Sequence, residues 1–224
     1  MGSDNLFHKN KIRKAKDLAR RAAKRAPYET ILIVCEGTKT ECNYLRDFCR
    51  IYKLNTANII VISATRGSAP ISIINYAIEY AENTLDIDHV ICLFDRDEHQ
   101  SYQQALDKIK NHKPRRNAKS KPKYHAITST PCFEIWLLLH FTYSTRAFYK
   151  SGNKSAGDNL IDALREYMPR YVKNTSNLFS QLQEKLPIAI QHAKQLTAHN
   201  QETKSVNPST NVNELMERLI NLIR

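Results

Sequence analysis

The stretch VICLFDRDEH, residues 90–99, joins a short apolar run to two aspartates, Asp95 and Asp97, that stand one residue apart. An apolar run of this length is typical of a buried strand. On an extended chain, alternate residues point to the same side, so the two carboxylates share one location. Like charges at that separation raise each other's pKa unless a cation lies between them. A divalent metal ion is therefore the expected partner of this strand end.

Strand-like and helix-like segments alternate through the first 130 residues. The strand-like runs are ETILIVCE (29–36), NIIVISAT (58–65), DHVICLFD (88–95) and YHAITS (124–129). Between them, apolar residues recur every three or four positions, and Pro70 stands at the start of one such segment. This alternation predicts an α/β fold with a mostly parallel sheet, right-handed crossovers and helices on both faces.

The remainder of the chain is predicted to be helical. The apolar run CFEIWLLLHF follows Pro131, and helices are expected near 159–167, 175–197 and 211–223, the last with Thr210 or Asn211 as its N-cap. We find no internal repeat and no separate second domain. The predicted organisation is a basic N-terminal arm (1–28), an α/β core (29–130) and a helical C-terminal extension packed on the core (131–224).

Composition narrows the class of protein. The chain has 224 residues and a formal net charge of +12, and this charge favours an acidic partner such as nucleic acid, although ribosome-like or membrane-surface binding fits the charge as well. Its five cysteines are odd in number and lack CxxC spacing, so we expect buried reduced thiols. With no secretory leader and no apolar run of about 18 residues, we expect a cytoplasmic protein without a membrane span.

Two segments are dense in positive charge: the arm HKNKIRKAKDLARRAAKR (8–25) and KPRRNAKSKPK (113–123). Both are predicted to neutralise phosphates, which would make binding strongly dependent on salt. A disordered tail and a solvated loop are the alternatives. The predicted nucleic-acid-binding residues are Arg13, Lys14, Arg20, Arg21, Lys24, Arg25, Lys113, Arg115, Arg116, Lys119, Lys121 and Lys123.

Three carboxylates are predicted to meet at one edge of the sheet. Glu36 ends the first strand, and Asp95 and Asp97 end the third, and ligands of open α/β sheets bind beyond the carboxyl ends of the strands. Carboxylate oxygens suit Mg²⁺ (or Mn²⁺), which can polarise a phosphoryl oxygen. Glu36 would complete the metal shell or act as general acid or base.

Neighbours of Glu36 are candidates for contacts with a phosphate. Gly37 permits a tight turn, the helix that follows presents free amide groups, and Lys39 adds positive charge. A plain strand-to-helix turn explains Gly37 equally well. Glu41 in the first helical turn is explained by the helix dipole alone, and this favours a structural role over catalysis.

Three further polar residues, His99, Glu134 and His140, could have either a structural or a functional role. His99 follows the aspartates and is a candidate for contact with a substrate phosphate. Glu134 lies in an apolar segment, so its burial requires a basic partner or the metal edge. His140 is expected to be a hydrogen-bonded core residue, and it forms no HExxH motif with Glu134, which excludes a zinc protease of that type.

The glutamate-glycine strand end and the later Asp-x-Asp resemble the TOPRIM domain of topoisomerases, primases and OLD-type nucleases, over about residues 29–130. ILIVCEGTKTECNYL, VICLFDRDEH, TPCFEIWLLLHF and NPSTNVNELM together are similar to the RloB family of phage-defence proteins, also called the AbiLii type. This resemblance implies a TOPRIM-like, Rossmann-like core and metal-dependent nuclease activity in abortive infection. It also implies an ABC-type or AAA-type ATPase partner encoded alongside.

Two functions from different classes remain open. The first is a Mg²⁺-dependent nuclease acting on RNA, including transfer RNA, or on DNA. The second is a non-catalytic nucleic-acid-binding regulatory subunit with a structural metal site. A receiver-like domain would carry an aspartate pair after the first strand, where this chain has Glu36, and no GxxxxGK[ST] of a P-loop ATPase is present. Self-association is left open.

Overall fold

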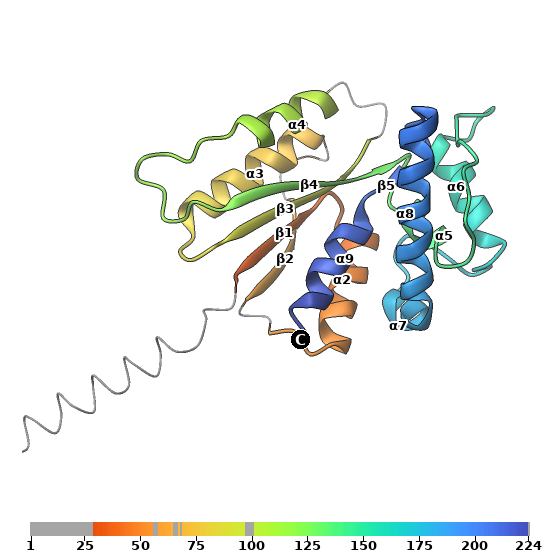
Figure 1. Cartoon of the computed structure of the whole chain (residues 1–224), viewed down its shortest axis with the longest axis horizontal. Helices are drawn as coiled ribbons and strands as arrows, with labels where there is room; N and C mark the ends of the chain where they lie inside the picture. The colour runs from red at the N-terminus through yellow and green to blue at the C-terminus, as the bar shows by residue number, and fades with distance from the viewer. Residues whose placement is uncertain (1–28, 56–57, 65–66, 68, 97–100, 224) are drawn as a thin grey trace, which may run out of the picture.

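The computed structural model describes residues 29–55, 58–64, 67, 69–96 and 101–223. Within them the chain forms a five-stranded sheet in the order β2-β1-β3-β4-β5 (Figure 1). The strands are β1 (Ile31–Cys35), β2 (Ile59–Ser63), β3 (His89–Asp95), β4 (Lys123–Thr130) and β5 (Ser209–Thr210). Strands β1 to β4 are parallel, and β5 pairs antiparallel with the end of β4. The predicted α/β fold with a mostly parallel, Rossmann-like sheet is confirmed, while β5 was not predicted.

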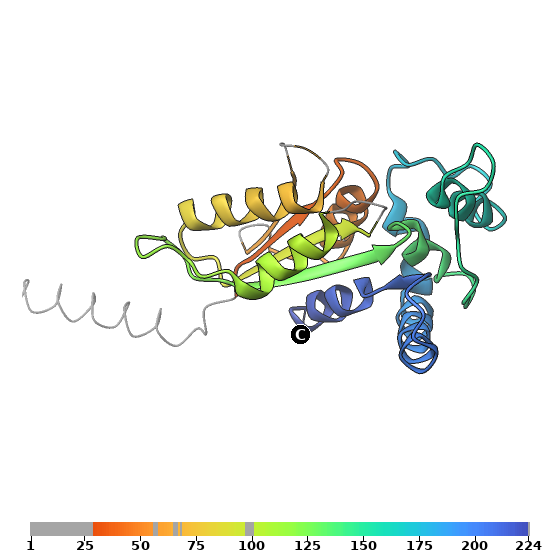
Figure 2. The same cartoon turned by 90° about the horizontal axis from the view of Figure 1, so that it is seen from above.

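Helices cover both faces of the sheet. Helices α3 (Pro70–Asn83) and α4 (Tyr102–Asn111) lie on one face, and α2 (Thr40–Ile51) and α9 (Val212–Asn221) lie on the other (Figures 1 and 2). Every residue of β1 is completely buried. Alternate β1 side chains enter the two separate apolar clusters on the two faces, which is the result of the two-residue period of a strand.

The connections between the strands determine where a ligand-binding crevice is expected. After β1 the chain passes through α2 to β2 on one side, whereas after β3 it passes through α4 to β4 on the other side. The strand order therefore reverses between β1 and β3. In open α/β sheets the crevice at such a reversal, beyond the carboxyl ends of the strands, is the usual binding position.

Apart from α9, the helices of the C-terminal extension lie beyond the carboxyl ends of the strands (Figure 1). They are α5 (Glu134–Leu138), α6 (Ala156–Arg165), α7 (Leu178–Leu182), the 3-10 turn η1 (Gln183–Lys185) and α8 (Leu186–Thr203). Their apolar residues share one cluster with β1 and α2, so the extension packs on the core without a second hydrophobic core of its own.

Two predicted helices differ from those observed. The single helix predicted for 175–197 is wrong, because the chain forms α7, η1 and α8, with Pro187 in the first turn of α8. Proline lacks the amide needed inside a helix and is tolerated in the first turn, so a new helix begins there. The apolar run after Pro131 gives only the short helix α5. Asn211, one of the two predicted caps, is the N-cap of α9.

The five cysteines are free and buried, as predicted. In the described part of the chain, no helix combines the length and the apolar character needed to cross a bilayer.

A buried carboxylate joins the core to the extension. Asp47 of α2 is 6% exposed, and its Oδ2 accepts the Ser180 amide hydrogen at 2.7 Å. The Ser180 hydroxyl donates to the same carboxylate, and Arg50 forms an ion pair with it. Because these donors compensate the buried charge, Asp47 ties α2 to α7.

We expect Asp47→Ala to lower the free energy of unfolding by about 2–4 kcal/mol, since the Ser180 amide would lose its partner in a buried position. Urea unfolding followed by circular dichroism measures the change. Glu217→Ala is the matched control, because Glu217 pairs with Lys194 at the surface and exposed pairs contribute little. Equal losses in the two variants would contradict the structural role of Asp47.

Candidate active site

A pocket of about 430 Å³ opens at the carboxyl edge of the sheet, at the reversal between β1 and β3. We call it the acidic pocket, because four of its side chains are carboxylates. Its lining residues are Glu36, Gly37, Thr38, Lys39, Thr40, Glu41, Asp95, Cys132, Glu134, Ser155, Gly157 and Lys173.

Strand register brings two of the carboxylates together. Glu36 directly follows β1, Asp95 is the last residue of β3, and the two strands are neighbours with Cys35 opposite Leu93. The Glu36 amide donates to the Leu93 carbonyl at 2.9 Å, which extends the pairing by one residue. The Asp95 amide in turn donates to Oε2 of Glu36 at 3.0 Å. Both strand-end acids that the structure describes therefore lie in one place.

The other two carboxylates come from helices on either side. Glu41 stands in the first turn of α2, and Glu134 begins α5 and is 2% exposed. Burial raises the pKa of Glu41 to about 7, with the charges of Glu134 and Glu36 acting in the same direction. Glu41 therefore stands both at the positive end of the α2 dipole and within a crowded acidic group.

Gly37 lies against this group. A Cβ atom added at Gly37 would stand 3.3 Å from Oε2 of Glu41, which is closer than ordinary van der Waals contact. The glycine therefore leaves room for the Glu41 carboxylate beside the end of β1.

Two hydrogen bonds fix Glu134 and its surroundings. The hydroxyl of Tyr171, a residue only 2% exposed, donates to Oε1 of Glu134 at 2.8 Å. Thr40 donates to the Lys173 carbonyl at 2.8 Å, which holds the segment after α6 against the start of α2. A basic side chain or the metal edge was the expected partner of Glu134; its hydrogen-bond donor is instead the neutral Tyr171 hydroxyl, and Glu134 lines the pocket that holds Glu36 and Asp95.

Lysines supply the positive charge of the pocket. Partial burial lowers the pKa of Lys173, but the charge of Glu134, aided by Asp95 and Glu41, outweighs it and raises that pKa above its ordinary value. Lys173 thus remains protonated near neutral pH. Lys39, the N-cap residue of α2, also lines the pocket.

Cys132 is unsuited to act as a nucleophile. Burial raises the pKa of its thiol well above the ordinary value, and the negative charges of Glu134 and Asp95 add to the shift. The thiolate is the reactive form of cysteine, and the acidic pocket disfavours it.

Sequence reasoning did not identify several lining residues, among them Lys173, Ser155 and Cys132. Lys173 lies in a segment without regular secondary structure between α6 and α7, where no hydrophobic period or motif marks it. Its position in the pocket depends on the long-range contact of that segment with α2.

Some predicted residues lie elsewhere. Asp97, His99 and the predicted arm residues 13–25 are outside the described residues. His140 is a core residue, as expected: its Nδ1 donates to the Trp136 carbonyl at 2.9 Å, and its Nε2 accepts the Tyr44 hydroxyl at 3.2 Å. Burial lowers the pKa of His140 to about 4, so the ring is neutral.

The basic loop 113–123 lies at the opposite edge of the sheet, before the start of β4 (Figure 1). Its basic residues are exposed. The eight residues of β4 separate the two edges by roughly 25 Å at about 3.3 Å per residue. The loop therefore does not belong to the acidic pocket.

The donor set of the acidic pocket suits a Mg²⁺ ion that keeps several of its water ligands. Among the described residues, no three or more His, Cys, Asp or Glu side chains are grouped so as to hold one metal ion. Mg²⁺ is usually bound through one or two carboxylates, waters and substrate phosphates, without a cage made wholly of protein. Glu36 and Asp95 at adjoining strand ends provide that donor set.

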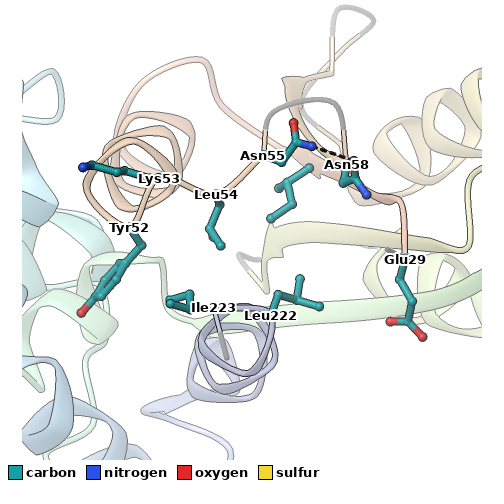
Figure 3. Close-up of a pocket in the computed structure, with 9 residues that line it drawn as sticks. Glu29, Tyr52, Lys53, Leu54, Asn55, Asn58, Leu222 and Ile223 are labelled. Atoms are coloured by element: carbon teal, nitrogen blue, oxygen red, sulfur yellow. Dashed lines mark hydrogen bonds between the residues drawn. The ribbon is translucent and has the colours of Figure 1, made fainter. Parts of the chain in front are cut away.

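Another pocket, of about 300 Å³, lies between the end of α2, the start of β2 and the end of α9 (Figure 3). Leu54, Leu222 and Ile223 surround it, and Asn55 donates to Asn58 at its rim at 3.3 Å. Glu29 is the one carboxylate among the described residues that line it. This pocket adjoins the amino edge of the sheet and lacks the crowded charges of the acidic pocket.

Comparison with known proteins gives one match. A family model described as RloB-like protein matches residues 31–219. No curated protein and no solved structure is significantly similar to the chain.

The raised pKa of Glu41 predicts a pH-dependent stability. Because the folded state holds the Glu41 proton up to about pH 7 and the unfolded chain releases it near its ordinary pKa, stability falls as pH rises through this interval. We expect Glu41→Gln to match the unchanged protein at about pH 4, below the ordinary pKa, and to exceed it by about 1–3 kcal/mol at about pH 8. Urea unfolding in EDTA at both pH values measures the difference.

Glu202→Gln, an exposed substitution on α8, is the control and should leave the pH profile of stability unchanged. A pH-independent difference between Glu41→Gln and the unchanged protein would contradict a proton held at Glu41.

Proposed function

The chain belongs to the RloB-like family, and from this premise we propose that it is a metal-dependent nuclease that hydrolyses phosphodiester bonds in RNA, including transfer RNA, or in DNA. The observation that carries the proposal is the acidic pocket. Four carboxylates and two lysines line one pocket at the position where open α/β sheets bind ligands.

Glu36 and Asp95, together with the predicted ligand Asp97, would hold Mg²⁺ or Mn²⁺. When bound, the ion would polarise a phosphoryl oxygen and stabilise the charge that develops on the leaving oxygen. Crowded carboxylates support this assignment, because a cation would relieve the repulsion that Glu134 and Glu36 add to the effect of burial on the pKa of Glu41.

Other residues of the pocket suit the remaining tasks. Glu41 titrates near neutral pH, which is the property of an effective general acid or base. Lys173 and Lys39 offer protonated amines to phosphate oxygens, and the first turn of α2 adds the positive end of a helix dipole. The Tyr171 hydroxyl orients Glu134. The resemblance to TOPRIM enzymes agrees with a metal-binding or acid-base role for Glu36.

The same resemblance extends the proposal to the cellular setting. We place the protein in the cytoplasm, in abortive-infection defence against phage, with an ABC-type or AAA-type ATPase that controls or delivers it. Self-association is compatible with this arrangement.

The second candidate is a non-catalytic nucleic-acid-binding subunit. The hydrogen bonds that Oε2 of Glu36 and Oε1 of Glu134 already accept favour it, because oxygens so engaged are less available to a metal ion. A cleavage assay distinguishes the two candidates.

We expect Asp95→Asn to reduce cleavage of labelled RNA or DNA by about 100-fold or more in Mg²⁺ or Mn²⁺, since a bound metal supplies several kilocalories per mole of transition-state stabilisation. EDTA should abolish cleavage by the unchanged protein. Mg²⁺ should also raise the thermal unfolding midpoint of the unchanged protein and not that of Asp95→Asn. Glu217→Gln, at the surface ion pair with Lys194, is the control.

Cleavage that survives EDTA or the Asp95 substitution would contradict the metal site. Binding of nucleic acid without cleavage under any condition, with the ATPase partner present or absent, would support the second candidate.

The basic loop is positioned to contact nucleic acid outside the acidic pocket. Buried Glu82 holds it: the carboxylate accepts the Arg115 amide hydrogen at 3.1 Å, and the Glu82 carbonyl accepts that of Lys119 at 3.1 Å. Lys113, Arg116 and Lys119 are exposed on the loop. Its backbone is thus anchored to α3 while its positive charges face solvent.

We expect the double substitution Arg116→Gln and Lys119→Gln to weaken duplex binding and to reduce the slope of log affinity against log salt by about 2, because each phosphate contact contributes about 0.9. Fluorescence anisotropy over a salt series in EDTA measures the slope. The matched control, Lys150→Gln with Lys204→Gln, removes two exposed charges from the helical extension. Equal slopes for the two double variants would exclude the loop from the interface.

A further inference from the structure

The helical extension forms a further pocket, which is connected to the acidic pocket through Tyr171 and Glu134. It has a volume of about 560 Å³, and no acidic side chain is among its described lining residues. We call it the aromatic pocket. It is lined by Phe141, Tyr167, Met168, Pro169, Arg170, Tyr171, Thr175, Gln181 and Leu182.

A stacked pair of rings dominates this pocket. The rings of Phe141 and Tyr167 lie with centroids 5.4 Å apart and planes inclined by 20°. The Lys185 amine lies 5.3 Å from the Phe141 ring centroid. Tyr167 is nevertheless 44% exposed. Solvent therefore meets a large flat ring whose orientation is set by the ring behind it.

One segment connects the aromatic pocket to the acidic pocket. Tyr171 lines the aromatic pocket, while its hydroxyl donates to Glu134 and lies 3.4 Å from the Thr40 hydroxyl, both in the acidic pocket. Along the same segment, Arg170 lines the aromatic pocket and Lys173 lines the acidic one. Two cations three residues apart thus lie on a short path between the pockets.

This combination matches the chemistry of an unpaired nucleotide. Aromatic rings stack on the faces of bases, and nearby cations neutralise the adjoining phosphates, in proteins that bind single strands. A base inside a duplex is covered by its neighbours on both faces and cannot stack on a protein ring unless it leaves the helix. Arg170 lines the aromatic pocket and Lys185 lies over its Phe141 ring, so the pocket has the nearby positive charge that a phosphate-linked ligand requires.

We propose that the aromatic pocket binds an unpaired base of the substrate through Tyr167, while Arg170 contacts an adjoining phosphate and the neighbouring phosphodiester enters the acidic pocket. The substrate class is single-stranded or looped nucleic acid. This inference rests on the proposed function for the role of the acidic pocket, but it concerns binding and is tested without cleavage.

The test measures the affinity of labelled 12-nucleotide RNA and DNA single strands, and of blunt 12-base-pair duplexes, by fluorescence anisotropy in EDTA. Tyr167→Ala should weaken single-strand binding about tenfold or more, whereas Tyr167→Phe, which keeps the ring, should stay within about twofold. Arg170→Ala, which leaves the stacked pair intact, should weaken single-strand binding severalfold. Duplex binding should change little in all three variants.

A strand with one abasic nucleotide separates stacking from a loss of folding. If Tyr167 stacks on a base, moving the abasic position along the strand should identify one register in which the unchanged protein loses affinity and Tyr167→Ala loses none further. Single-strand affinity unchanged in both Tyr167→Ala and Arg170→Ala would overturn the proposal. So would an equal loss of single-strand and duplex affinity.

Failure of this proposal is distinct from failure of the proposed function. The Tyr167 effect is measured in EDTA, without cleavage, and Glu217→Gln, at the surface ion pair with Lys194, should bind single strands as the unchanged protein does. A protein that cuts in Mg²⁺ but shows no Tyr167 effect retains the nuclease assignment and loses the base site. A protein that binds through Tyr167 but never cuts retains the base site alone.

Discussion

The pairing of β1 with β3 is the constraint on which the candidate site depends. It sets Glu36 beside Asp95, with the Asp95 amide donating to the Glu36 carboxylate. The strand order reverses between the same two strands, so the helices leave in opposite directions and a crevice opens at their carboxyl ends. A slip of one residue in this register would turn Glu36 or Asp95 to the opposite face and separate the two carboxylates.

The close approach of the four carboxylates in the acidic pocket is unfavourable for folding, and for that reason it indicates a binding site. Burial, together with the charges of Glu134 and Glu36, raises the pKa of Glu41 toward neutrality, and such crowding of acids persists only where the surrounding structure or a ligand compensates it. Tyr171 and Lys173 supply part of that compensation from within the chain. The acidic pocket as a whole therefore combines several carboxylates with lysines, and this combination suits a cation and a phosphate bound together.

The sequence predicted the sheet and its two described acidic ends because these depend on local patterns. Apolar runs identify buried strands, and parallel strands bring their carboxyl ends to one edge, so Glu36 and Asp95 needed no tertiary information. Lys173 and Tyr171 could not be found in this way, because the loop after α6 reaches the pocket through long-range contacts with Thr40 and Glu134. The break between α7 and α8 is marked in the sequence by Pro187, in the first turn of α8, and the prediction of one helix over 175–197 overlooked it.

The core and the helical extension contribute different parts of the candidate site. A Rossmann-like sheet provides an edge and two strand-end acids, but it offers no surface that selects a ligand. The extension adds Glu134 and Lys173 to the acidic pocket and builds the aromatic pocket beside it. Tyr171 lines the aromatic pocket, and its hydroxyl donates to Glu134, which lines the acidic pocket. A displacement of the segment that carries it would therefore alter the charge balance of the acidic pocket and the shape of its neighbour at the same time.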